Sequence, residues 1–70
     1  MIYELWSVAG HNLLQTFDSE GDAWHALRRL AEKHGEQYLA RLALTREDEE
    51  GETITLAVGK DLVKQLHATA

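Results

Sequence analysis

The stretch Phe17-Asp18-Ser19-Glu20-Gly21-Asp22 opens the segment that decides the fold, which continues as AWHALRRLAEKH and stops at Gly35. Ser19 is a favourable N-cap residue, and Asp22 three positions later gives a Ser-x-x-Asp form of the capping box. Acidic residues in the first turn oppose the positive end of the helix dipole. Glycine commonly follows the last turn of a helix. These signals predict a helix that begins after Ser19 and ends at Gly35.

Plotted at about 100° per residue, this helix has an apolar and a basic face. The apolar stripe consists of Ala23, Leu27, Leu30, Ala31 and His34, with Trp24 at its edge. The basic face carries His25, Arg28, Arg29 and Lys33. We expect the apolar stripe to pack on a sheet. The basic face is interpreted as dipole compensation with ion pairs such as Arg28–Glu32, and a contact with a small phosphate or an acidic peptide is the alternative.

A strand pair precedes the helix. The spans Ile2 to Val8 and Leu13 to Phe17 are rich in β-branched, aromatic and leucine residues, and a turn over residues 9–12 joins them. Both faces of the first strand are partly apolar. One face holds Tyr3 and Leu5, and the other holds Ile2, Trp6 and Val8 together with Glu4. This pattern predicts a central strand, or a strand whose second face meets another subunit.

A second strand pair follows the helix. Residues 36–40 predict either a loop or one more helical turn. We expect a strand over Leu39 to Glu47, with Ala40, Leu42 and Leu44 on one face. An acidic turn separates it from a strand over Thr53 to Val58, in which Ile54, Leu56 and Val58 point one way and Thr53, Thr55 and Ala57 the other. A short helix that opens at Asp61 completes the chain.

Together these elements predict one α+β domain over residues 1–70, in the order ββαββα. We expect a four-stranded, mainly antiparallel sheet with the long helix packed on one face and the short C-terminal helix at its edge; the pattern does not give the strand order. A chain of 70 residues buries only about 60% of its unfolded surface. Marginal stability of this kind favours self-association, and we predict a homodimer.

Charge and composition exclude several classes of function. Twelve acidic residues against seven basic ones give a net charge of −5, which argues against nucleic-acid and membrane-surface binding. The chain has no cysteine, so disulfides and thiolate zinc sites are excluded. No apolar run approaches the roughly 20 residues of a membrane span. We find no signal peptide at the N-terminus and expect a cytoplasmic protein.

No segment carries a catalytic, metal or cofactor signature, so no such residue or cofactor is predicted. The four histidines His11, His25, His34 and His67 lack metal-ligand spacing, and His34 is interpreted as a residue packed at the helix end. The acids of residues 47–52 lack the spacing of a calcium loop and are interpreted as a solvated turn that blunts a sheet edge. Docking of a basic partner at this turn is the alternative. Motifs for a nucleophilic serine or a phosphate-binding loop are also missing.

The two tryptophans are the strongest candidates for an interaction surface, because tryptophan is enriched at the energetic centres of interfaces. We predict Ile2, Trp6, Val8 and Trp24 as interface candidates. For Trp24 the alternative is that its ring fastens the helix to the sheet.

Several segments carry a resemblance to known proteins. These segments are Tyr3-Glu4-Leu5-Trp6, Asn12-Leu13-Leu14, Thr16-Phe17-Asp18-Ser19-Glu20 and Arg46-Glu47-Asp48. The chain resembles a group of small bacterial ββαββ(α) proteins of unknown function, and more loosely HicB-type antitoxin domains. The second likeness implies binding to a toxin and self-association. HicB-type proteins usually add a DNA-binding segment with no counterpart in these residues, so the likeness implies no repressor role.

We therefore expect a non-catalytic protein-interaction module that self-associates, with an antitoxin-like role as its narrower form. The alternative is a small ligand-binding protein or enzyme whose site of histidines and carboxylates forms across a dimer.

Overall fold

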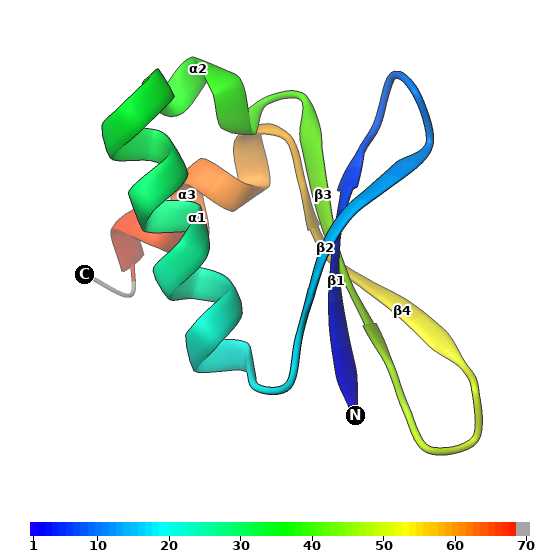
Figure 1. The fold of residues 1–70 in the computed structure, drawn as a ribbon. Coiled ribbons are helices and arrows are strands. Elements are labelled where there is room, and N and C mark those ends of the chain that lie inside the picture. Colours follow the sequence, from blue (N-terminus) through cyan, green and yellow to red (C-terminus); the bar gives the residue numbers. More distant parts are fainter. Residues whose placement is uncertain (69–70) are drawn as a thin grey trace.

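The computed structural model describes residues 1–68, which form one antiparallel sheet with helices on one side (Figure 1). In chain order the elements are β1 (Ile2–Ser7), β2 (Asn12–Phe17), α1 (Glu20–His34), α2 (Glu36–Leu39), β3 (Leu42–Glu47), β4 (Thr53–Val58) and α3 (Lys60–Ala68). The prediction of an α+β fold with a long helix after the first hairpin and a short C-terminal helix is confirmed.

The sheet has the order β2-β1-β3-β4, so the first strand is central, as its two apolar faces indicate. All three neighbouring pairs are antiparallel. In the central pair, Leu5 lies opposite Leu44 and Trp6 lies opposite Ala43. The two hairpins are therefore joined through their first strands, β1 and β3, while β2 and β4 form the two edges of the sheet.

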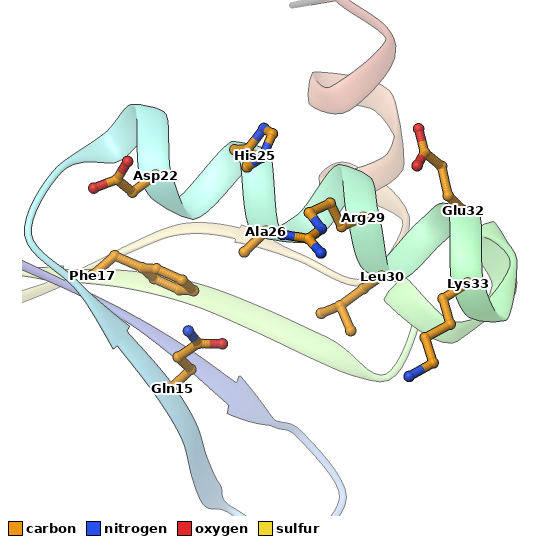
Figure 2. Close-up of a pocket in the computed structure, with 9 residues that line it drawn as sticks. All are labelled: Gln15, Phe17, Asp22, His25, Ala26, Arg29, Leu30, Glu32 and Lys33. Atoms are coloured by element: carbon orange, nitrogen blue, oxygen red, sulfur yellow. The ribbon is translucent and has the colours of Figure 1, made fainter.

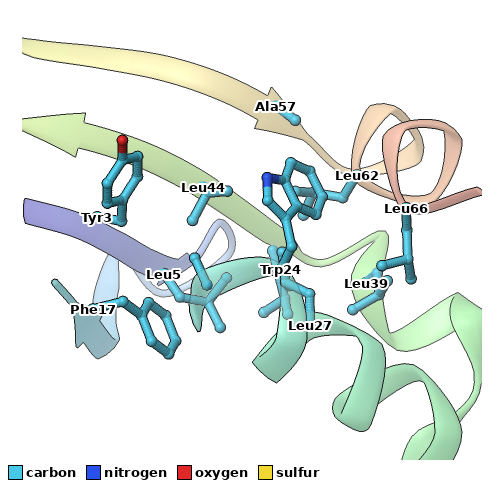
Figure 3. Packing of buried hydrophobic residues seen from close by; sticks show 12 residues of the cluster. Tyr3, Leu5, Phe17, Trp24, Leu27, Leu39, Leu44, Ala57, Leu62 and Leu66 are labelled. Atoms are coloured by element: carbon cyan, nitrogen blue, oxygen red, sulfur yellow. The ribbon is translucent and has the colours of Figure 1, made fainter. Parts of the chain in front are cut away.

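Leucine side chains from the sheet and from all three helices form the core between the two layers (Figure 3). Leu5 and Leu44 contribute from the sheet, Leu27 from α1, Leu39 from α2 and Leu62 from α3, and all five are almost completely buried. Because α1 lies across β1 and β2 while α3 lies across β3 and β4, both halves of the sheet are covered on this face.

Local interactions at both ends of α1 follow the sequence signals. The Ser19 hydroxyl accepts a hydrogen bond of 3.1 Å from the backbone N–H of Asp22, as an N-cap requires. At the other end, Gly35 has a φ of 88° and donates its N–H to the carbonyl of Ala31. The positive φ is available to glycine at little cost, which explains why the helix ends at this residue.

Two sequence predictions about the second half are corrected. The expected strand from Leu39 begins only at Leu42, because residues 36–39 form the short helix α2 and turn Leu39 into the core. Ala40 follows this helix as an exposed turn residue, so it does not share a strand face with Leu42 and Leu44.

The predicted faces of β4 are also wrong. The register with β3 shifts between Leu44 and Thr45, so Leu56 is an extra residue opposite them. Beyond this bulge the alternation reverses, since a one-residue shift moves side chains to the other face. Ala57, opposite Leu44, is consequently in the core at 4% exposed, and Val58 lies on the other side opposite Ala43. Ile54, opposite Arg46, lies on the same side as Ala57 but is 43% exposed.

His34 does not pack into the core as the apolar stripe predicts. Its side chain is exposed, and its ring lies 4.7 Å from that of Tyr38 in α2. The stripe is buried at Ala23 and Leu27 but only partly so at Leu30. At the last turn of α1, His34 therefore has Tyr38 of α2 as its neighbour instead of a core residue. None of the helices within residues 1–68 combines the length and the hydropathy of a membrane-spanning segment.

Candidate interaction surface

The face of the sheet opposite the helices is the principal candidate site. All helices of the described chain lie on one side of the sheet, which leaves the other side uncovered (Figure 1). Side chains alternate along a strand, so with Tyr3 and Leu5 of β1 in the core, Ile2, Glu4 and Trp6 fall on the uncovered side. We call this side the open face.

The register brings residues of three strands together on the open face. Ile2 pairs with Glu47, Glu4 with Thr45, and Trp6 with Ala43, and the last two rows continue into Thr55 and Val58 of β4. A hollow of about 450 Å³ lies over this part of the sheet. Its lining consists of Glu4, Trp6, Ser7, Val8, His11, Ala43, Thr45, Glu47, Thr53, Thr55 and Val58.

Trp6 is held in place at the centre of the open face. Its indole Nε1–H donates a hydrogen bond of 3.0 Å to the hydroxyl of Thr45 on the neighbouring strand. The Thr45 hydroxyl in turn donates to the carbonyl of Glu4, at 3.5 Å. A ring whose polar atom already has a partner loses little side-chain freedom on binding, and it presents a rigid apolar surface. This arrangement suits an anchor residue of a protein interface.

The open face is acidic. Glu4 and Glu47 line the hollow, and in the described chain neither lysine nor arginine lines it. The β3–β4 turn, with its further acids at residues 48–52, continues from the Glu47 end of the face. Asp48 fixes this turn by accepting two backbone hydrogen bonds of 2.9 Å, from Glu50 and Glu52. Apolar groups next to carboxylates favour partners that combine apolar and basic side chains.

Three of the four predicted interface residues meet on the open face. The partly buried Trp6 and Val8, which follows β1 and is 42% exposed, both line the hollow. Ile2, 45% exposed, lies on the same face beyond Glu4. Trp24 does not belong with them. It is 8% exposed in the core on the other side of the sheet (Figure 3). Its Nε1–H donates to the Glu20 carboxylate at 3.0 Å. The interface prediction for Trp24 is corrected in favour of its alternative, in which the ring fastens α1 to the sheet.

The basic face of α1 is divided between two places. His25, Arg29 and Lys33 line a groove of about 630 Å³ between α1 and the edge strand β2 (Figure 2). Arg28 is half-buried and lies instead beside Glu36 and His67, near α3. Sequence reasoning did not foresee the groove, because its other wall comes from Gln15 and Phe17 of β2. The amphipathic pattern of α1 carries no information on which strand lies beside it.

The histidines occupy separate positions. His11 lies in the β1–β2 turn with a φ of 53°, and His25 is exposed on α1. His67 of α3 lies 2.7 Å from the carboxylate of Glu36 in α2, and both side chains are exposed. Within residues 1–68, no group of three or more histidine or acidic side chains could hold a metal ion. The His67–Glu36 pair links two helices on the surface, and a histidine and carboxylate site across a dimer stays a prediction.

Fold and site together define a small α+β protein with one covered and one open sheet face. No protein-family model matches the chain, and neither curated proteins nor solved structures give a match.

Proposed function

We propose that this chain is a non-catalytic protein-interaction module, and that the open face around Trp6 binds a basic partner protein. The observation that carries the proposal is the apolar group Trp6, Val8 and Val58 in the hollow of a sheet face that no helix covers in the described chain (Figure 1). Contiguous apolar side chains rimmed by polar ones mark binding surfaces on small proteins.

Charge supports a basic partner over a second copy as the occupant of the open face. Glu4 and Glu47 lie on the face itself, and the acidic β3–β4 turn adjoins it. A partner with lysine or arginine beside apolar side chains would neutralise these carboxylates and bury Trp6. Such complementarity raises association rates and selects partners. An antitoxin-like role, in which the module covers a basic surface of a toxin, is the narrower form of the proposal, and we place it in the cytoplasm.

Site-specific cross-linking tests the proposal. A photo-reactive benzoylphenylalanine replaces Thr55 on the open face in one variant and Glu32 on α1 in a matched control variant. Both positions are exposed, and they lie on opposite sides of the molecule. The variants are expressed in the host, illuminated and purified, and the cross-linked proteins are identified by mass spectrometry.

The expected result is one basic protein that cross-links through Thr55 and not through Glu32, and whose binding weakens with added salt because the attraction is screened. Trp6→Ala should remove this cross-link, since the anchor ring is then absent. Cross-linking that is equal from the two positions, or no cross-link from Thr55, would contradict the assignment of the open face.

A further inference from the structure

The two edges of the sheet differ in how they are protected. Edge strands expose unpaired backbone groups, which other strands can pair with unless charge, bulges or covering elements block them. On β4, the side-chain amide of Gln65 in α3 donates to the carbonyl of Leu56 at 3.3 Å, and α3 lies beside the strand. Of the two edges, β2 is therefore the one whose backbone receives no side-chain hydrogen bond in the described chain.

Like β4, β2 has no charged residue or proline to block pairing along the edge. Its residues 12–17 read NLLQTF. Leu13 and Leu14 are 47% and 48% exposed although they are adjacent in one strand. The register with β1 shifts at this point, which leaves Gln15 to Phe17 as the regular part of the edge. A second strand can pair with this part.

The groove beside β2 shows which strand fits. Its α1 wall carries Asp22 at its start and, towards its end, the two bases Arg29 and Lys33 with one acid, Glu32, so the end is basic by one net charge (Figure 2). If two copies join through antiparallel β2 strands, their α1 helices also run antiparallel across the joint. A two-fold axis then places the acidic start of each α1 beside the basic end of the other. The wall is therefore complementary to itself.

We infer that two copies of this chain associate along β2, forming one eight-stranded sheet whose grooves face each other across the two-fold axis. This dimer would be the self-association expected of the proposed module. Its interface is separate from the open face, which remains free to bind the partner protein. Apolar groups for the joint come from the exposed Leu14 of β2 and the partly buried Leu30 of α1. Asp22 and Lys33 of opposite copies provide its charge contacts.

A charge-exchange experiment tests this arrangement. The variants are Asp22→Lys and Lys33→Glu, with Asp61→Lys and Lys64→Glu as matched controls on α3. Self-association is measured by sedimentation equilibrium over a range of protein concentrations, and circular dichroism verifies that each variant is folded. Each test variant repels its own kind at two symmetric contacts, so its dimer should be about tenfold weaker than the unmodified dimer. The controls should leave the dimer constant unchanged.

An equimolar mixture of the two test variants is the decisive sample. In the mixed pair, the lysine introduced into one copy would meet the glutamate introduced into the other. At the second contact the unchanged Lys33 and Asp22 would meet, so attraction returns at both contacts. Heterodimers should therefore form at least as strongly as the unmodified dimer. A strictly monomeric unmodified protein, or a mixture no stronger than its components, would overturn the inference.

Trp6→Ala separates this inference from the proposed function. Its dimer constant should equal that of the unmodified protein, because Trp6 lies on the open face and not at the β2 edge. If Trp6→Ala abolished the dimer while the charge variants left it intact, the dimer would use the open face. That outcome would refute β2 pairing and also remove the open face from partner binding.

Discussion

Substitution of each tryptophan tests which face of the sheet is covered by the helices, because Trp6 and Trp24 lie on opposite faces of the same sheet. Trp24 is 8% exposed and packed in the core, whereas Trp6 rests on the open face with solvent on one side. Replacement of a buried tryptophan by alanine costs about 3–5 kcal/mol, because apolar contacts are lost and a cavity remains. Trp24→Ala also removes the hydrogen bond to Glu20.

The expected loss at Trp6 is smaller. Trp6→Ala removes a ring that packs on one side only, together with the hydrogen bond to Thr45. The bond contributes about 1 kcal/mol, and Thr45 still has the carbonyl of Glu4 as a partner. We expect a total loss of about 1–2 kcal/mol. A chain of 70 residues is stable by about 4–10 kcal/mol, so Trp24→Ala should remove a large share of the stability and Trp6→Ala a minor one.

Urea unfolding followed by far-UV circular dichroism measures both losses at one protein concentration, since self-association adds to apparent stability. With a slope of about 1 kcal/mol per molar urea, the midpoint should fall by about 3 M or more for Trp24→Ala and by about 1–2 M for Trp6→Ala. Trp24→Leu keeps part of the apolar volume, and it provides a measurable intermediate case if the alanine variant does not fold.

Fluorescence gives an independent reading, because each variant retains one tryptophan. Emission from Trp24 in the Trp6→Ala variant should lie at shorter wavelength than emission from Trp6 in the Trp24→Leu variant. Equal losses of stability at the two positions would refute the reasoning, because they would place Trp6 in a second covered layer.

Three further predictions concern local structure. Ser19→Ala should lower the free energy of unfolding by about 0.5–2 kcal/mol through loss of the N-cap, while Ser19→Asp retains it; chemical denaturation measures the difference. Asp48→Ala should lower the free energy of unfolding by about 1–2 kcal/mol, because two backbone N–H groups of the β3–β4 turn lose their acceptor. Asp48→Asn should restore most of this stability. Unchanged hydrogen exchange of the two amides in Asp48→Ala would contradict the role of Asp48 in the turn. Gly59→Ala should lower the free energy of unfolding by about 1–3 kcal/mol, because φ is 58° and the added Cβ would lie 3.2 Å from the carbonyl oxygen of Ala40. A melting temperature equal to that of the unmodified protein would contradict this prediction.

Helix α1 was predictable from the sequence, because capping and dipole effects act within a few neighbouring residues. The signals were its N-cap, its acidic first turn and the glycine at its end. The faces of β1 were predictable for the same kind of reason. Alternation along a strand has a period of two, so Tyr3 and Leu5 necessarily lie opposite Trp6. The structure places Ile2, Trp6 and Val8 on one face, as this alternation predicts, and their interface role stays a prediction.

The predictions that were wrong, and the features that were not predicted, all depend on contacts between distant segments. The bulge at Leu56 is set by pairing between β3 and β4, and it reverses which side chains of β4 are buried. The groove needs β2 beside α1, and the bond from Gln65 to β4 needs α3 to fold back over the sheet. Local sequence therefore determined the elements, their ends and the two-sided character of the first strand. Only the tertiary structure decided which edge is left unprotected and which tryptophan is buried, because register and helix placement minimise exposed apolar surface over the whole chain at once.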